Sequence, residues 1–367
     1  MRVTKVLALL LGVVLASVAS TPVAVSVVAE PCAATFTDPE SVVIYVGAYT
    51  RDEGWVNGTA KGINAFSFDP RKGTLTHLCE TDVGINPTFI RGTKVRKGKN
   101  QKQFLYAVNE ISDPSQDVPD TTTGYVVAIE VAGKGQLKVL NRLETHGPGP
   151  THISVSPSEG FVAASMYGGG GVILYPVAKN GSLAPSSDAH FYTEGSKVKG
   201  PQEAAHLHST TWVPGSDIVF AADLGNDQIV QYKLDVKTKK FDNTTYPISA
   251  IQNISTLPVD FNGTSSSADI HVSADGKFVY SSNRGHNSIA IFKVKSQKDG
   301  TLEWVGSEST RGELPRSFLL YKEFLIVANQ NTDNIEVFRR NAADGTLTHT
   351  GNSAKSNTPV CLYIPPN

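Results

Sequence analysis

Two histidines of this chain are spaced for shared chemistry. His206 and His208 lie two residues apart, so on a β-strand their side chains would share one face. With Glu203 upstream, they could bind a metal ion, or act as a general base and the group that orients it. Because no third ligand follows at a regular spacing, no metal or other cofactor is expected. A polar network that lines a cavity is the structural alternative.

Other polar residues follow short apolar runs. His152, in segment 150–154, is either catalytic or a hydrogen-bonded strand histidine. Arg284 suits a phosphate or carboxylate, which a guanidinium binds through two parallel hydrogen bonds, and a structural salt bridge is the alternative. Arg316 is a second anion-binding candidate. Glu110 is a candidate carboxylate that could act as a base only if burial or a like charge raised its pKa.

The chain lacks the sequence motifs of several common kinds of functional site. The chain has neither a Gly-x-Ser-x-Gly nor a Walker sequence, and Gly168–Gly171 reads as a hairpin because no helix follows it. Its three cysteines have no Cys-x-x-Cys spacing, which disfavours a cysteine zinc site. A formal net charge of −1 over 367 residues provides no overall field for nucleic acid or an anionic membrane.

The first 29 residues are predicted to be a cleaved signal peptide. Arg2 and Lys5 precede an apolar run that extends to Ser20, and small residues follow. An uncleaved anchor is the alternative, although Pro22 makes a poor membrane span. Residues 30–41 would form a tail, and the protein is expected to be secreted, without membrane contact after cleavage. The sequence does not indicate an oligomeric state.

Secretion permits disulfides and N-glycans. Either Cys32 pairs with Cys79 and leaves Cys361 free, or all three remain thiols. Glycosylation sequons, which agree with a secreted glycoprotein, begin at Asn57, Asn180, Asn243, Asn253 and Asn262.

A repeat must position these residues. Short β-branched and aromatic runs recur in six units, whose turns are anchored at Leu75, Leu137, Leu183, Phe241, Leu302 and Leu347. Units of about 45 residues with four strands are typical of β-propeller blades. Segment 359–364 is predicted to supply the strand that the first unit lacks, and so to close the ring. Residues 42–367 are therefore expected to form one all-β domain.

Five phrases carry a family resemblance. Segments 45–50, 105–110, 221–227, 281–289 and 327–331 resemble the seven-bladed propeller lactonases, the family of bacterial 6-phosphogluconolactonase and fungal carboxy-muconate lactonizing enzyme. The resemblance spans residues 42–365. Only residues 242–268 stand where the family has a full blade, through blade loss or an omitted exon, and a six-bladed ring would have a narrower channel. Pro201 and Ala205 replace a family Arg and Pro.

The resemblance implies hydrolysis of a small-molecule lactone or anionic sugar in the central channel. Water would attack the lactone carbonyl, with His152 or the His206/Glu203 pair as general base. Arg284 would bind the anionic group or stabilise the oxyanion. The other predicted substrate-binding residues are His208, Glu110 and Arg316. A muconate-lactonizing cyclase and a non-catalytic secreted propeller that binds a ligand or protein are the alternatives.

Overall fold

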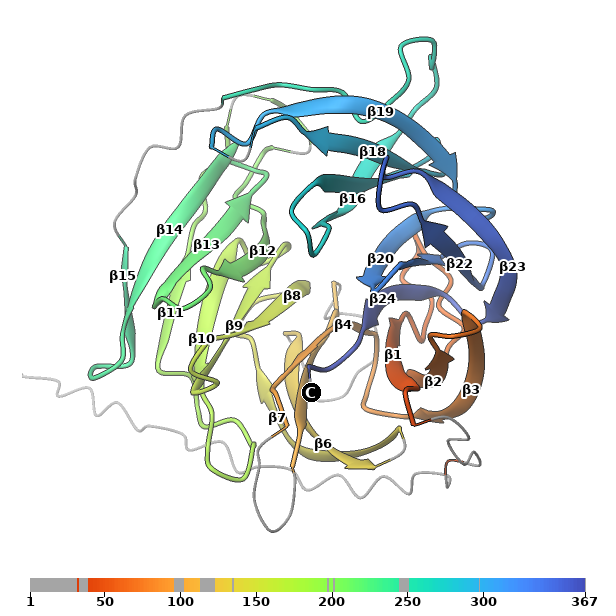
Figure 1. Cartoon of the computed structure of the whole chain (residues 1–367). Helices are drawn as coiled ribbons and strands as arrows, with labels where there is room; N and C mark the ends of the chain where they lie inside the picture. The colour runs from red at the N-terminus through yellow and green to blue at the C-terminus, as the bar shows by residue number, and fades with distance from the viewer. Residues whose placement is uncertain are drawn as a thin grey trace, which may run out of the picture.

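The computed structural model describes residues 32, 39–95, 102–112, 123–133, 135–196, 198–200, 202–243, 251–296 and 298–366. Its strands form six four-stranded antiparallel sheets, which are the blades of a propeller around a central channel (Figure 1). The predicted all-β propeller with six units is thereby confirmed. The predicted signal peptide lies outside the described residues. In the described part of the chain, no helix has the length and apolar character needed to cross a membrane.

The blades are numbered here from I to VI, and each is given from its innermost strand outward. Blade I consists of β24 (Pro359–Tyr363), β1 (Val42–Ala48), β2 (Ile63–Asp69) and β3 (Thr74–Thr81). Blade II consists of β4 (Pro87–Gly92), β5 (Phe104–Asn109), β6 (Tyr125–Gly133) and β7 (Gln136–Glu144). Blade III consists of β8 (Pro150–Val155), β9 (Phe161–Met166), β10 (Gly171–Pro176) and β11 (Asp188–Phe191).

The other three blades follow the same plan. Blade IV consists of β12 (Leu207–Trp212), β13 (Ile218–Asp223), β14 (Gln228–Asp235) and β15 (Lys240–Asn243). Blade V consists of β16 (Ser266–Val272), β17 (Phe278–Arg284), β18 (Ser288–Val294) and β19 (Leu302–Ser309). Blade VI consists of β20 (Pro315–Tyr321), β21 (Phe324–Asn329), β22 (Asn334–Arg340) and β23 (Leu347–Lys355).

The C-terminal strand β24 closes the ring, as predicted. It pairs antiparallel with β1, so that Val46 lies opposite Leu362, and Figure 1 shows the blue end of the chain beside the red one. Near this junction, a disulfide joins Cys32 to Cys79 in β3, with Cα atoms 4.9 Å apart, and Cys361 stays free and buried. The predicted pairing is confirmed.

Apolar cores fill the spaces between neighbouring blades. The second strands β5, β9 and β21 are buried at every residue, because each is covered by a blade on both faces. In β13 of blade IV only alternate residues are buried, the pattern of a strand covered on one face. Among the described residues, no apolar core joins blade IV to blade V, whereas one lies between every other neighbouring pair.

The seam between blades IV and V is therefore open. We had expected a six-bladed ring to have a narrower channel, but these two blades have not closed over the missing position. The connection between them covers part of blade V instead: Ile254 packs near Phe292, and Gln252 hydrogen-bonds the backbone of Leu302. Burying an Ile or Leu side chain stabilises a fold by about 1.5–3 kcal/mol, a contribution that the uncovered faces forgo.

Candidate active site

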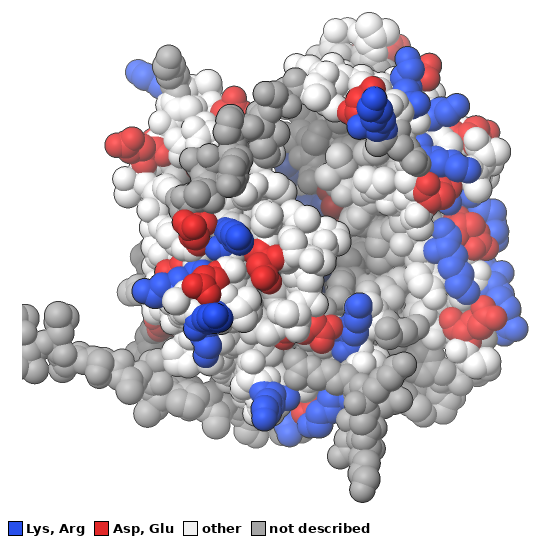
Figure 2. Space-filling model, turned by 60° about the vertical axis from the view of Figure 1, so that its left-hand side comes forward, with Lys and Arg blue, Asp and Glu red and all other residues white. Residues whose placement is uncertain are grey.

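The innermost strands surround a cavity of about 770 Å³ in the channel. Figure 2 shows the molecule hollowed in the middle, with charged side chains deep in the hollow and both signs interspersed over the rest of the visible face. Five of the seven predicted site residues line this cavity: Glu110, His152, His208, Arg284 and Arg316. His206 and Glu203 are not among its lining residues.

A β-bulge in each inner strand aims side chains into the channel. The register shifts occur near the start of each strand, for example between Leu207 and Ser209 in β12 and between Pro315 and Ser317 in β20. A bulge leaves its extra residue out of the ladder and turns it toward a new direction. The residues at the bulges that line the cavity are Thr88, Thr151, His208, Ala268, Asp269, Arg316 and Val360.

Two guanidinium groups lie close together at this cavity. Arg284 donates from Nη2 to the carbonyl of Ser267 at 3.1 Å, and its Nε atom is buried without a hydrogen-bond partner. Burial, and then the positive charge of Arg316, lower the pKa of Arg284. Among the described residues, neither arginine forms an ion pair with a carboxylate. Two unpaired cations that repel each other form a site for an anion or a developing oxyanion.

Arg316 is held in place by aromatic rings rather than by an acid. Its guanidinium carbon lies 5.5 Å from the ring of Tyr49 and 5.6 Å from that of Trp55, and Nη1 contacts Oε1 of Gln330 at 3.4 Å. Cation–π contacts of this kind orient a guanidinium without neutralising it. The charge of Arg316 therefore remains available to a ligand.

Two histidines share the cavity, and both are neutral at pH 7. Burial and the nearby charges of Arg91 and His208 lower the pKa of His152 well below its usual value. Enclosure by the channel walls, then Arg316 and Arg284, lower the pKa of His208 to about 4. A neutral imidazole can accept a proton at one nitrogen and donate one from the other.

The backbone fixes the tautomer of His152. The N–H group of Thr210 in β12 donates to Nδ1 of His152 at 3.3 Å, so the neutral ring carries its proton on Nε2. The ring also lies against Phe89, with centroids 4.1 Å apart. In this state His152 is a hydrogen-bond donor at Nε2, which suits an oxyanion better than the base role that we predicted for it.

Glu110 is a buried carboxylate with both oxygens occupied. Oε1 accepts a hydrogen bond from the hydroxyl of Tyr49 at 2.9 Å, and Oε2 accepts one from Thr88 at 2.7 Å. Burial and the charge of Glu110 raise the pKa of Tyr49, so that the phenol keeps its proton and donates. Glu110 therefore anchors Tyr49, which in turn lies against Arg316.

The structure does not bring His206 and Glu203 into the cavity. His206 precedes β12, its ring stacks on Tyr167 at 4.3 Å, and its Nδ1 atom contacts the Tyr167 carbonyl oxygen at 2.9 Å. Glu203 is exposed, and among the described residues no hydrogen bond or ion pair joins it to His206. His206 precedes β12 and His208 is the extra residue of the bulge, so strand alternation does not apply to the two, although both rings contact Tyr167.

The sequence reasoning missed three polar residues of the channel. Arg91 ends above the ring of Phe89 at 4.1 Å, and the Nε2 atom of His271 lies 3.1 Å from Oδ1 of Asp269. Asp269 and His271 lie on the inner strand β16, and their polar side chains within a short strand-like run were the available signal. In the part of the chain that the structure describes, no group of three His, Cys, Asp or Glu side chains could hold a metal ion.

Comparisons with known proteins agree with this architecture. The family model described as "Lactonase, 7-bladed beta-propeller" matches residues 43–247 and 235–364, and the two matches overlap over residues 235–247, a stretch that includes β15 of blade IV. The 6-phosphogluconolactonase of Bacillus subtilis is 30% identical over 361 residues, which cover 87% of this chain and 97% of that protein. That of Formosa agariphila is 32% identical over 351 residues, covering 83% and 94% respectively.

A solved structure extends the likeness. A Bacteroides fragilis protein assigned as a 6-phosphogluconolactonase has a TM-score of 0.74 at 27% identity, over 90% of this chain and 99% of that one. The expected family, whose named relatives are lactone hydrolases, is thus confirmed. This chain belongs to the lactonase family of seven-bladed β-propellers, as a member with six blades in its structure.

Proposed function

We propose that this protein hydrolyses a sugar lactone in the central channel. The observation that carries the proposal is that one cavity is lined by two guanidinium groups without a carboxylate partner and by two neutral imidazoles. The names of the relatives support a sugar lactone, as 6-phosphogluconolactonases open the lactone of a phosphorylated sugar acid. Arg284 and Arg316 supply the charge that such a phosphate or carboxylate requires.

His208 is the general base in this proposal, in place of the His206/Glu203 pair. Its neutral ring accepts a proton from water as the water oxygen bonds to the lactone carbonyl carbon. His152 donates from Nε2 to the resulting oxyanion, beside Arg284. The ring C–O bond then breaks, and the proton on His208 passes to the leaving alkoxide, which yields the open hydroxy acid.

Anion binding also strengthens this base. The positive charges of Arg316 and Arg284 contribute to the low pKa of His208. A substrate phosphate that pairs with these arginines offsets their charge, and so raises the pKa of His208 toward its usual value. The base would therefore become effective when an anionic substrate is bound.

The test is the opening of 6-phosphogluconolactone and δ-gluconolactone, each corrected for hydrolysis in buffer. Arg284→Met should reduce kcat/KM for the phosphorylated lactone by about 10²-fold or more, since charge-assisted hydrogen bonds are lost from an enclosed site. Arg339→Met is the matched control, because Arg339 is half exposed and pairs with Glu323 on blade VI. Hydrolysis no faster than buffer for both lactones would refute the proposal.

We further propose that the protein acts outside the cytosol. The support is the N-terminal sequence, with its basic and apolar regions, together with the disulfide between Cys32 and Cys79. Expression of the full chain in a secreting eukaryotic host should release a shortened protein into the medium. Retention of the complete N-terminus inside the cells would contradict this localisation.

A further inference from the structure

The open seam between blades IV and V is continuous with the catalytic cavity. Ala222 and Leu224 of blade IV and Ile270 of blade V line the same space as His152 and Arg284. A ligand whose ring lies beside these polar groups can therefore extend sideways between the two blades. In the other seams this direction is closed by an apolar core.

Exposed aliphatic side chains lie on both walls of this seam. On blade IV, Leu224 and Ile229 are 47% and 48% exposed. On blade V, Ile270 and Val272 are 65% and 59% exposed. These side chains match the surface of an alkyl chain, and the half-buried Phe220, two residues before Ala222 on the uncovered face of β13, adds further apolar surface.

The exposure of Ile270 follows from its place in the repeat. Ile270 lies opposite Ser281 in the ladder of blade V, and the equivalent residues are Phe318 in blade VI, opposite Val327, and Leu362 in blade I, opposite Val46. Those two are 0% and 4% exposed, since each packs into the core toward the preceding blade. In blade V no neighbouring blade covers this position, so the apolar side chain of Ile270 stays exposed.

The outer part of the seam is already in use on the blade V side. Thr256 donates to Oδ1 of Asn283 at 2.8 Å, and Ile254 packs against the core of Val279, Ala290 and Phe292. The uncovered surface therefore lies next to the channel, beside β16. Its position favours a substituent of the bound lactone as the occupant over a separate protein segment.

We propose that the substrate is a lactone that carries an aliphatic chain, with its ring in the channel and its chain in the seam between blades IV and V. This inference rests on the proposed lactonase function and changes its substrate class from a plain sugar lactone to a lactone that bears an alkyl chain. A cavity of about 770 Å³ lies within the range of roughly 300–1,000 Å³ that encloses drug-sized ligands, and so leaves room beyond a single small ring.

The experiment compares δ-valerolactone with δ-decalactone, which adds a pentyl chain to the same ring, and includes δ-gluconolactone as the reference sugar lactone. Each methylene group that becomes fully buried strengthens binding about threefold to fourfold. In a seam that remains partly open, kcat/KM should be at least about tenfold higher for δ-decalactone than for δ-valerolactone. Ile270→Asn and Leu224→Asn should remove most of this ratio, which is taken within each variant against its own turnover of δ-valerolactone.

Val236→Gln is the matched control, because Val236 is an exposed aliphatic residue in the outer hairpin of blade IV and glutamine there creates no glycosylation sequon. It should preserve the chain-length ratio. Equal turnover of the two alkyl lactones, with δ-gluconolactone still opened, would overturn the inference and leave the lactonase function standing. An unchanged ratio in Ile270→Asn together with a loss of self-association in sedimentation would assign the seam to a second copy of the chain. Absence of turnover with all three lactones and with 6-phosphogluconolactone would refute the lactonase function itself, and the inference with it.

Discussion

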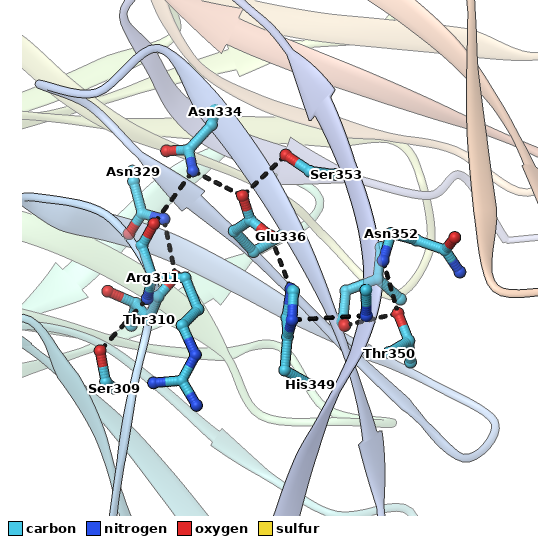
Figure 3. Close-up of polar contacts among 12 residues, drawn as sticks. Ser309, Thr310, Arg311, Asn329, Asn334, Glu336, His349, Thr350, Asn352 and Ser353 are labelled. Carbon is cyan, nitrogen blue, oxygen red and sulfur yellow. Dashed lines mark hydrogen bonds and ion pairs between the residues drawn. The ribbon is translucent and has the colours of Figure 1, made fainter.

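Histidines occupy two contrasting environments in this propeller. In blade VI, Nε2 of His349 lies 2.7 Å from Oε2 of Glu336, whose other oxygen accepts hydrogen bonds from Asn334 and Ser353 (Figure 3). The backbone N–H of Gly351 donates to Nδ1 of the same ring at 3.3 Å. Every polar atom of this group has a partner, as expected for a network that stabilises a blade.

The channel histidines differ in the charges around them. His152 and His208 lie near arginines, and both have lowered pKa values. The network in blade VI has a counterpart in blade I, where Nε2 of His77 lies 2.9 Å from Oδ1 of Asn64. Repetition in another blade indicates a structural role. The channel group occurs once, at a cavity, and holds charges that the fold leaves uncompensated, which is the arrangement expected of a reactive site.

The largest difference between the two environments should appear when one histidine of each is removed. His208→Ala should lower kcat/KM for the best lactone by about 10²–10⁴-fold, the range for loss of a general base. His349→Ala should change kcat/KM by less than about threefold, since Glu336 and His349 lie on the outer strands of blade VI. Comparable losses in both variants, measured on folded protein, would contradict the distinction.

Substitution by lysine should impair the enzyme more at an arginine of the channel than at an arginine on the outer surface of blade VI. Arg316→Lys should raise KM for a phosphorylated lactone about tenfold, because lysine cannot form two parallel hydrogen bonds or keep the guanidinium contacts with the rings of Tyr49 and Trp55. Arg339→Lys should leave KM unchanged. Steady-state kinetics at constant ionic strength would measure both. A similar KM in the two variants would mean that Arg316 has no contact with the substrate.

The pH profile should reveal the charges around His208. Protonation removes the base, so kcat/KM should stay level at neutral pH and fall as the pH approaches about 4, the value for the free enzyme. With a phosphorylated lactone, the acid limb of kcat should lie at higher pH than that of kcat/KM, since the bound anion offsets Arg316 and Arg284. With uncharged δ-gluconolactone the two limbs should coincide. An acid limb of kcat at lower pH than that of kcat/KM, with the phosphorylated lactone, would show that the bound anion does not raise the pKa of His208.

The smallest effect on catalysis should come from Glu336. Glu336→Ala should lower the free energy of unfolding by about 2 kcal/mol, because Asn334, His349 and Ser353 lose their hydrogen bonds to a buried charged group. Turnover of the best lactone should remain within about twofold of the original. Denaturant titration and kinetics on the same preparation would test this, and a stable but inactive variant would place Glu336 in the functional machinery.

The sequence was sufficient for the fold because the repeat is strong. The inner strands and the closing segment 359–364 appear in the structure close to their predicted limits, as at β24 (Pro359–Tyr363). Alternation and turn residues are local signals, and each blade repeats them. The open seam could not be predicted in the same way, because the count of six blades does not say whether blades IV and V pack together or remain apart.

The site was predictable where a polar residue lies on an inner strand of its own blade. His152, His208 and Arg316 were found for that reason, whereas Glu110 and Arg284 were found at the ends of the second strands β5 and β17. His206 was misplaced because the start of β12 and its bulge depend on pairing with β13, which residue spacing does not reveal. Arg91 was missed because its proximity to the other channel residues exists only once separate blades surround one axis.

The closure of blade I by β24 has a consequence for biosynthesis. Strands β1, β2 and β3 leave the ribosome early, but the partner of β1 is encoded more than 300 residues later. At about 5–20 residues per second, the inner edge of β1 waits for roughly 15–60 s before β24 is available. During that interval an unpaired edge can join a neighbouring nascent chain. The slowest and most error-prone event in the life of this molecule should therefore be the last pairing, and chaperones that delay contact between chains should improve its yield.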